Sequence, residues 1–315
     1  MKYKVFIDGK EGTTGLRIYD RLAKRDDIEL MLIPEDLRKD PEERSKYINN
    51  SDITFLCLPD QAAIEAVSLV TNNKTRIIDA STAHRCDPAW AYGFPELSID
   101  FYNKIKNSAR VAVPGCYASG FMSIVYPLVT LGVAPKDYPF TVNAISGYSG
   151  AGKKAIAVYE DNNRAKEFDA PRLYAMSQAH KHLKEMQAIP GLSKKPCFNP
   201  YVCDFLEGML VTIPLFVDLL NKPYTPMEIH KLLSDYYNGK DFVRVMPYND
   251  KGTEDGFLAA NHLDGKDYLE IYVSGNEERI NITACLDNLG KGASGAALEC
   301  MNIMLGLDPK TSLNL

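Results

Sequence analysis

The chain has 315 residues, of which 45% are hydrophobic and 24% charged, which is the composition of a globular protein and excludes a disordered, collagen-like or coiled-coil one. Its 36 basic and 41 acidic residues give a net charge of −5, so no general attraction for nucleic acid or an anionic membrane is expected. No apolar run is long enough to span a bilayer, and the start of the chain lacks the apolar region of a signal peptide.

The first third of the chain alternates strand and helix patterns. Apolar runs predict strands at residues 4–7, 28–33, 52–58, 76–80 and 110–113, with helices at 14–24 and 61–70. Strands separated by helices are typical of βαβ units, so we expect a parallel sheet of the dinucleotide-binding type.

The pattern changes after residue 116. A helix is expected at about 117–131, followed by more polar strands at 140–145, 208–214, 242–245, 268–274 and 280–285, and by a last helix at 292–305. Alternating apolar and polar residues, as at 269–274, are typical of half-buried antiparallel strands. We therefore expect an α/β first domain over 1–115, completed by about 286–315 with the last helix packing on it. A second, α+β domain covers 116–285.

A glycine-rich turn follows the first strand. Gly9, Gly12 and Gly15 stand three apart at the start of a helix, and Thr13 and Thr14 add hydroxyl groups. Such a turn lets the backbone approach a pyrophosphate, which the helix N-terminus attracts. The spacing is not the usual GxGxxG, and a turn that only caps a helix is the alternative.

Further cofactor contacts are expected where later strands end, since α/β sheets bind ligands at their carboxyl edge. Pro59 and Ser81 occupy such positions. After the second strand, Arg38 and Lys39 could bind the 2′-phosphate of NADP, whereas Glu35 could bind the ribose of NAD. A solvated charged loop is equally compatible with this segment.

Cys116 follows Pro114-Gly115 where a strand ends and a helix begins. The helix dipole and the N–H groups there favour the thiolate, which is the nucleophilic form. The alternative is a buried structural cysteine. The seven cysteines form no close-spaced framework, so we expect reduced thiols in a cytoplasmic protein.

Histidine occurs five times, which limits the candidates for an acid or base. His180 and His182 form an H-x-H pair, and His84 is a second candidate. Because residues two apart lie on different faces of a helix, only one of the pair is expected to face a reacting group. Together with Cys197 and Cys203 the pair fits no standard zinc spacing, so no metal site is expected.

Two loops suit an anionic substrate group. The glycine-rich loop at 146–154 contains Ser149 and two lysines, and backbone N–H groups with a nearby lysine favour an anion. Arg85 follows the fourth strand and could bind a carboxylate or phosphate with two N–H groups. Ordinary solvent-exposed loops are the alternative for both.

Seven motifs together resemble one enzyme family, the short-form N-acetyl-gamma-glutamyl-phosphate reductases. They are DGKEGTTGL at 8–16, FLCLPD at 55–60, DASTAHR at 79–85, YGFPEL at 92–97, VPGCYA at 113–118, SGYSG at 146–150 and DNLGKGASGAA at 287–297. The resemblance covers essentially the whole chain. It implies a fold like that of glyceraldehyde-3-phosphate and aspartate-semialdehyde dehydrogenases, and the NADPH-dependent reduction of an acyl phosphate to an aldehyde in arginine biosynthesis.

The same resemblance assigns roles to residues. It implies Cys116 as nucleophile, His180 as acid and base, Tyr174 and Glu185 as further site residues, and Asn288 as the residue that orients the nicotinamide. It also implies a dimer or tetramer. The rival interpretations are a reductase of aspartyl or aminoadipyl phosphate and a catalytically silent NADP-binding sensor.

Overall fold

The computed structural model describes residues 2–315, which form two compact units. Unit 1 contains the chain up to Pro114 together with Ala293–Leu313. Unit 2 contains Gly115–Gly292 and the last residues, Asn314–Leu315. Unit 2 is therefore inserted between two segments of unit 1.

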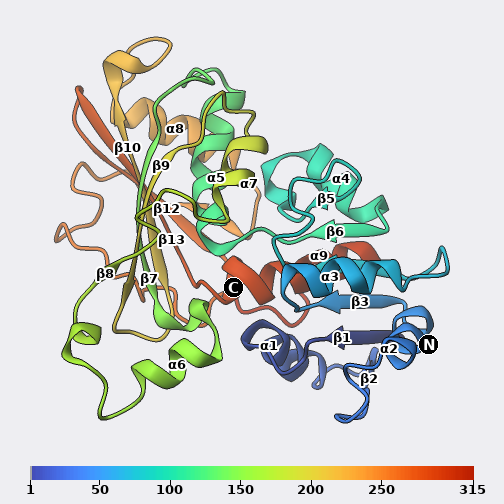
Figure 1. The fold of residues 1–315 in the computed structure, drawn as a ribbon. Coiled ribbons are helices and arrows are strands. Elements are labelled where there is room, and N and C mark those ends of the chain that lie inside the picture. Colours follow the sequence, from blue (N-terminus) through green and yellow to red (C-terminus); the bar gives the residue numbers. More distant parts are fainter. Residues whose placement is uncertain (1) are drawn as a thin grey trace. The chain divides into compact units, whose positions relative to one another are not determined.

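Unit 1 is built on a parallel sheet of six strands in the order β2-β1-β3-β4-β6-β5 (Figure 1). The strands are β1 (Tyr3–Asp8), β2 (Ile28–Met31), β3 (Ile53–Leu56), β4 (Arg76–Asp79), β5 (Ala91–Tyr92) and β6 (Arg110–Ala112). The helices are α1 (Thr13–Leu22), α2 (Pro41–Asn50), α3 (Asp60–Ser68), α4 (Ile99–Asn107) and α9 (Gly295–Leu305), with a 3₁₀ turn η1 (Pro95–Leu97). All pairings are parallel, which confirms the dinucleotide-binding architecture.

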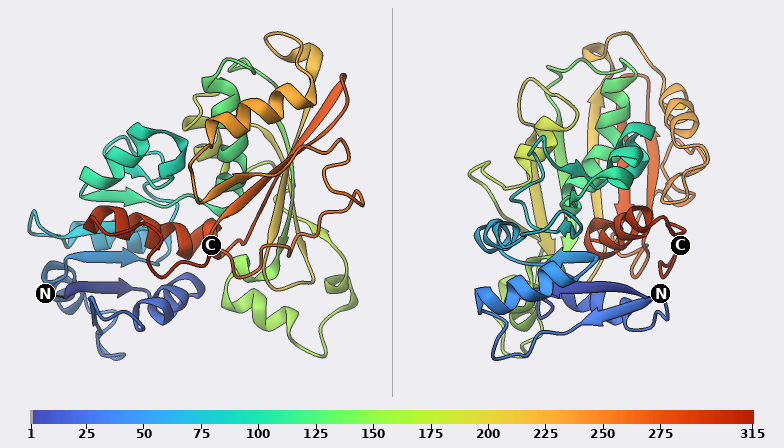
Figure 2. Two further views of the ribbon diagram at one scale, coloured as in Figure 1. Left: turned by 180° about the vertical axis from the view of Figure 1, so that it is seen from behind. Right: turned by 90° about the vertical axis from the view of Figure 1, so that its right-hand side faces the viewer.

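Helices cover both faces of this sheet because successive residues of a strand point to opposite faces. Val5 of β1 belongs to a core with residues of α1, α4 and α9, whereas its neighbour Phe6 belongs to a core with residues of α2 and α3. Met301 is fully buried in the first of these cores. The last helix thus packs on the first domain, as expected, and the rear view in Figure 2 shows α9 lying across the sheet.

Helix α2 is absent from the expected elements because its sequence is almost entirely polar and buries only Arg44 and Ile48. Its start nevertheless carries a local signal. Asp40 accepts hydrogen bonds from the backbone N–H groups of Glu42 and Glu43, and Pro41 stands at the first helical position. An acidic N-cap followed by proline is a standard helix start.

Unit 2 contains a mixed sheet of seven strands in the order β11-β12-β13-β10-β7-β9-β8. The strands are β7 (Thr141–Gly147), β8 (Arg172–Leu173), β9 (Cys197–Cys203), β10 (Met209–Phe216), β11 (Val243–Val245), β12 (Leu269–Gly275) and β13 (Arg279–Leu286). The helices are α5 (Cys116–Thr130), α6 (Lys153–Tyr159), α7 (Leu183–Ala188) and α8 (Pro226–Tyr236). Short turns are η2 (Tyr148–Ala151), η3 (Lys166–Asp169) and η4 (Val217–Leu219), and a π-helical turn, η5 (Gly290–Ser294), precedes α9.

Strand β9 is missing from the sequence-based expectations because Pro200 lies in its middle, and proline within an apolar run argues against a strand. β9 pairs in parallel with β7. Parallel neighbours need a long crossover connection, and here residues 148–196 provide it. Four of the expected site residues, Ser149, Tyr174, His180 and Glu185, lie on this connection.

Helices α5 and α8 pack against one face of the unit 2 sheet, as Figure 1 shows with the sheet nearly edge-on. On this face Ala144, Val211 and Ala284 are fully buried. None of the helices formed by residues 2–315 combines the length and apolar character needed to cross a bilayer.

Candidate active site

Cys116 is the first residue of α5, in the position expected from the sequence. Gly115, the N-cap, has extended backbone angles and no side chain caps the helix. The N–H groups of a first turn carry a partial positive charge. The half-buried thiol of Cys116 therefore stands where a thiolate and a developing oxyanion are both stabilised.

Glu185 of α7 holds the turn that precedes Cys116. Glu185 is 1% exposed, and its Oε2 accepts a hydrogen bond from the Gly115 N–H at 3.3 Å. Charge-assisted hydrogen bonds are stronger than neutral ones. This hydrogen bond links helix α7 to the residue that precedes helix α5.

Gly292 packs directly against the candidate nucleophile. A Cβ atom at this position would lie 2.8 Å from the Cβ of Cys116 and 3.0 Å from the Asp287 carbonyl oxygen. Any side chain would push Cys116 out of place. Sequence reasoning missed this residue, because a glycine near a helix start does not reveal which distant residue it approaches.

An aromatic cluster surrounds Tyr117, the residue after Cys116. The Tyr117 ring lies 5.8 Å from that of His180, 5.9 Å from His182 and 5.1 Å from Phe198, measured between ring centroids. The Tyr174 hydroxyl donates to the Tyr117 hydroxyl at 2.9 Å. Burial raises the pKa of Tyr117 well above its usual value, so the phenol stays neutral.

The histidine pair precedes helix α7 rather than lying within a helix, so the helical spacing assumed for the pair is wrong. The His180 and His182 rings are 4.6 Å apart, and both contact Tyr117. The His182 backbone N–H donates to Nδ1 of His180 at 3.2 Å. A neutral His180 with Nδ1 as acceptor carries its proton on Nε2.

The side chains of Ser149 and Asn288 are hydrogen-bonded to each other elsewhere in unit 2. The Asn288 Nδ2 donates to the Ser149 hydroxyl at 2.9 Å, and Oδ1 accepts from the Gly208 N–H at 2.9 Å. Both side chains are 1% exposed. One N–H of the Asn288 amide therefore holds the Ser149 turn, and the amide has a second N–H to offer a ligand.

In unit 1, the loop after β4 is organised by Asp79. Its buried carboxylate accepts from the Ser81 N–H and hydroxyl at 2.8 Å and pairs with Nδ1 of His84 at 2.6 Å. Arg85 donates to the Val113 carbonyl at 2.8 Å and to the Ala80 carbonyl at 3.2 Å. A positively charged side chain thus stands at the carboxyl edge of the sheet.

The glycine turn of unit 1 is sterically demanding at two of its three glycines. Gly9 has a φ of +88°, and a Cβ there would lie 2.4 Å from the Cys57 carbonyl oxygen. A Cβ on Gly15 would lie 2.5 Å from the Gly9 carbonyl oxygen, whereas one on Gly12 would keep 3.4 Å from it. Helix α1 starts at Thr13 and has no side-chain cap, so its first N–H groups can hold a phosphate.

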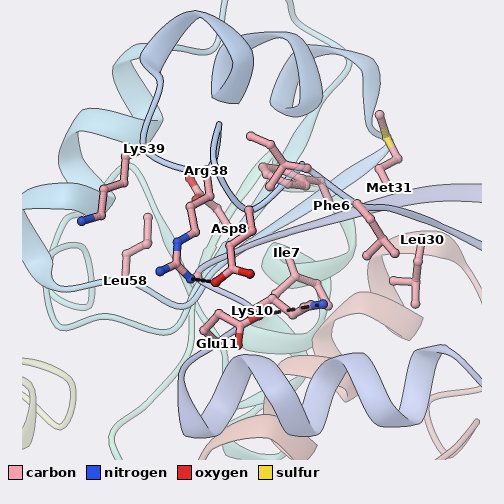
Figure 3. A pocket seen from close by; sticks show the side chains of 14 residues that line it. Phe6, Ile7, Asp8, Lys10, Glu11, Leu30, Met31, Arg38, Lys39 and Leu58 are labelled. Atoms are coloured by element: carbon pink, nitrogen blue, oxygen red, sulfur yellow. Dashed lines mark ion pairs between the residues drawn. The ribbon is translucent and has the colours of Figure 1, made fainter.

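A pocket of about 330 Å³ opens beside this turn (Figure 3). Gly9, Lys10 and Glu11 line it from the turn, and Arg38 and Lys39 line it from the loop after β2. The remaining lining residues are mainly apolar side chains of β1, β2 and the segment after β3. The Arg38 guanidinium, 3.7 Å from a Glu35 carboxylate oxygen, is 43% exposed, so its charge is accessible to a ligand.

The other cysteines have different surroundings from Cys116. Burial raises the pKa of Cys57 and of Cys285 to about 12, and it also raises that of Cys203. Cys86 and Cys197 are exposed. Neither of the exposed residues starts a helix: Cys86 lies in a turn and Cys197 begins strand β9.

Comparison with known proteins places this geometry in a class. Residues 116–288 match the family model described as "Semialdehyde dehydrogenase, dimerisation domain", and residues 32–105 match "Semialdehyde dehydrogenase, NAD binding domain". Solved structures titled aspartate semialdehyde dehydrogenase have the same fold. The Vibrio cholerae protein gives a TM-score of 0.73 at 15% identity, covering 97% of this chain and 99% of its own, and the Francisella tularensis protein gives 0.71 at 16%, covering 96% and 100%.

Two curated relatives are much more similar in sequence. A Nostoc protein named N-acetyl-gamma-glutamyl-phosphate reductase 2 is 47% identical over 99% of both chains. A Brucella ovis protein named N-acetyl-gamma-glutamyl-phosphate reductase is 46% identical over 97% of this chain and all of its own. The chain belongs to the semialdehyde dehydrogenase family and, within it, to the N-acetyl-gamma-glutamyl-phosphate reductases.

Proposed function

We propose that this protein reduces N-acetyl-glutamyl 5-phosphate with NADPH to N-acetyl-glutamate 5-semialdehyde and phosphate, a step of arginine biosynthesis. The observation that carries the proposal is the thiol of Cys116 at the uncapped start of α5, next to the cluster that holds His180. A nucleophile beside a proton donor is the arrangement that acyl transfer requires.

In the proposed reaction, the Cys116 thiolate attacks the carbonyl carbon of the acyl phosphate. N–H groups at the start of α5 stabilise the negative oxygen of the tetrahedral intermediate. The C–O bond to phosphate then breaks, inorganic phosphate leaves with the bonding electrons, and a thioester remains on Cys116. The thioester divides one difficult step into two easier ones.

Reduced nicotinamide, when bound, supplies the hydride that converts this thioester into a thiohemiacetal. Hydride addition leaves a negative charge on the oxygen of this tetrahedral intermediate, which the Nε2–H of His180 stabilises as a hydrogen-bond donor until the C–S bond breaks and the C=O bond re-forms. The aldehyde is released and the thiolate of Cys116 is restored. The hydrogen bond from the His182 amide suits His180 to this role because it leaves the proton on Nε2.

The residues of unit 1 fit a dinucleotide cofactor. Gly9 and Gly15 occupy positions that a Cβ would obstruct, and the uncapped start of α1 with Thr13 and Thr14 offers donors to a pyrophosphate. We propose further contacts from Pro59, which precedes α3, and from Ser81. Asn288 is proposed to orient the nicotinamide through its second amide N–H.

Replacing glycines of this turn gives a matched test of the cofactor site. Gly9→Ala forces a Cβ against the Cys57 carbonyl at a left-handed φ, so we expect NADPH binding to weaken by about 100-fold. Gly12→Ala, whose Cβ would keep 3.4 Å from the Gly9 carbonyl oxygen and 3.7 Å from the Cys57 carbonyl oxygen, is expected to weaken NADPH binding less than Gly9→Ala does. Fluorescence titration of both purified variants measures this. NADPH binding by Gly9→Ala that is as tight as in the parent would show that the turn does not hold the phosphates.

The preference for NADPH over NADH is assigned to Arg38. Its exposed guanidinium lines the pocket, and a charge-assisted contact to a 2′-phosphate is worth about 1.5–3 kcal/mol, or roughly 10- to 100-fold in affinity. Arg38→Ala should therefore weaken NADPH by that factor and leave NADH nearly unchanged, as measured by titration of both cofactors. If both weaken equally, Arg38 does not bind the 2′-phosphate and Glu35 becomes the ribose contact.

The substrate contacts are proposed from charge and position. Arg85 provides positive charge for an anionic group, and Ser149 contributes a hydroxyl that the Asn288 amide orients. The backbone N–H groups of Tyr148 and Ser149 donate to carbonyls of Phe205 and Leu206, so the expectation that they bind an anion is wrong. Tyr174 offers a phenol beside Tyr117. Glu185 acts on the substrate site through its hydrogen bond to Gly115.

A direct assay tests the function in the reverse direction. Purified protein is given N-acetylglutamate semialdehyde, phosphate and NADP, and formation of reduced cofactor is followed by absorbance. Aspartate semialdehyde and aminoadipate semialdehyde are the controls, because the alternative is a reductase of aspartyl or aminoadipyl phosphate. Faster turnover of either control would overturn the substrate assignment, and no turnover of any aldehyde would favour a silent NADP-binding sensor.

We also propose a homodimer formed by unit 2, in the cytoplasm. The face of the sheet opposite α5 carries a row of paired polar residues: Thr212 with Thr283 at 3.0 Å and Asn143 with Asn199 at 3.3 Å between their side chains. A broad sheet face of this kind suits an isologous contact with a second copy. The family model that covers this unit is described as a dimerisation domain. Sedimentation equilibrium should give twice the mass of one chain.

A further inference from the structure

His180 lies on a segment without regular secondary structure, so its position depends on what holds that segment. Residues 174–182 connect the short strand β8 to helix α7. At one end, the Tyr174 N–H donates to the Pro200 carbonyl of β9 at 3.1 Å. At the other end, His182 is the residue that precedes α7. Between these points the backbone makes only short turn contacts, from the Gln178 N–H to the Ala175 carbonyl at 3.0 Å and from the Leu183 N–H to the His180 carbonyl at 3.1 Å.

The middle of this segment is held by the side chain of Gln178. Its Nε2 donates to the Phe198 carbonyl at 2.8 Å, and its Oε1 accepts from the Phe198 N–H at 2.9 Å. The amide therefore pairs with both backbone groups of one residue of β9, much as a neighbouring strand would. We call this pair of hydrogen bonds the Gln178 clamp.

The backbone at Gln178 is in a conformation that a side chain disfavours. Its φ is +56°, and Ala175 in the same segment has a φ of +52°. Among residues 2–315 only one further residue other than glycine, Ser312, has a positive φ. Such conformations persist where surrounding contacts impose them, and they gather at functional sites. At Gln178 the surrounding contacts are the two hydrogen bonds of the clamp and the backbone hydrogen bond from the Gln178 N–H to the Ala175 carbonyl.

Phe198, whose backbone the Gln178 clamp binds, is also the residue against which His180 packs. The Phe198 side chain is 1% exposed, and its ring lies 5.1 Å from the His180 ring and 5.1 Å from the Tyr117 ring. Gln178 itself is exposed and outside the core. Its hydrogen bonds therefore link the His180 segment to strand β9, and the Gln178 side chain adds nothing to the hydrophobic core.

We propose that Gln178 is the positioning residue for His180: its clamp on Phe198 sets the turn that presents the Nε2–H of His180 to the reacting oxygen. The proposal rests on the proposed reductase function for its catalytic consequence. It predicts that loss of the clamp impairs the step in which His180 acts and leaves cofactor binding unchanged.

The test uses two variants in the full-length protein. Gln178→Gly removes the clamp and also relieves the disfavoured φ, so the fold should be retained. Ala175→Gly relieves a similar φ in the same segment without removing a side-chain hydrogen bond. We expect kcat of Gln178→Gly to fall about 10- to 100-fold with the KM for NADPH unchanged. Ala175→Gly should keep kcat within about threefold of the parent.

A second measurement reports on His180 directly. In protein labelled with ¹⁵N-histidine, His180 should show a single Nε2–H tautomer, with its signal assigned by loss in His180→Asn. Gln178→Gly should shift this signal toward a mixture of tautomers, and Ala175→Gly should not. The proposal is overturned if Gln178→Gly keeps both kcat and the tautomer, or if the two variants lose kcat equally. A parent protein inactive on the acyl phosphate, with a tautomer that still depends on Gln178, would refute the function and support the clamp.

Discussion

Cys116→Ala is expected to lower kcat by about 10⁴-fold or more, because no other group can form the thioester. The variant should still bind NADPH like the parent, since the contacts proposed for the cofactor's phosphates lie in unit 1 around Gly9 and Arg38. Alanine is small and the start of α5 has no side-chain cap to lose, so the fold should be preserved. Stopped-flow reduction assays and NADPH titration measure the two quantities separately.

The same prediction extends to chemical labelling. Limiting iodoacetamide at pH 7 should modify Cys116 first and abolish activity in proportion, and bound acyl substrate should protect it. Cys57 and Cys285, whose pKa values burial raises to about 12, carry almost no thiolate at that pH and should stay unmodified. The exposed Cys86 and Cys197 serve as internal references for ordinary thiols. Activity that survives complete labelling of Cys116, shown by peptide mass spectrometry, would exclude covalent catalysis.

His180→Asn should lower kcat by about 10²- to 10³-fold, the usual effect of removing one hydrogen-bond donor to a developing oxyanion. Asparagine can keep an acceptor near the His182 N–H but has no group at the position of Nε2. Binding of NADPH should be unaffected, and alkylation of Cys116 should continue, because the thiol itself is retained. Turnover is measured at saturating substrate and cofactor over a range of pH.

His182→Asn is the matched control for His180. The His182 ring is buried and packs on the same tyrosine, but it is its backbone N–H that supports His180. That N–H is present in any variant, so we expect a loss of about tenfold or less. A larger loss in His182→Asn than in His180→Asn would reverse the two roles.

The sequence predicted the parallel sheet, the glycine turn and the cysteine at a helix start because each has a local signal. Apolar runs alternate with helical patterns, Gly9 follows a strand, and Cys116 follows a proline and a glycine. Strand β9 and helix α2 have weaker signals, since Pro200 interrupts the first and polar residues dominate the second. Strand β9 and helix α2 are stabilised by contacts with other parts of the folded chain, which the local sequence does not reveal.

The geometry of the site depends on contacts between residues far apart in the sequence. Gly292 meets Cys116 across most of unit 2, and Gln178 meets Phe198 twenty residues later. Neither contact follows from spacing or periodicity. The histidine pair shows the same limit, because the helix assumed for it begins only at Leu183. A loop held by side-chain hydrogen bonds has no periodic pattern from which it could be predicted.

The insertion of unit 2 into unit 1 has a consequence for synthesis on the ribosome. The core on one face of the first sheet contains Ala297, Met301 and other residues of α9, which are translated only after the whole of unit 2. Until then, Val5 and Phe55 of that face have no helix α9 to cover them. Unit 2, whose segment 115–292 is continuous, can fold as it emerges, whereas unit 1 must wait in a partly folded state. The nascent protein should therefore depend most on a chaperone that binds apolar strands during the interval in which unit 2 is being made.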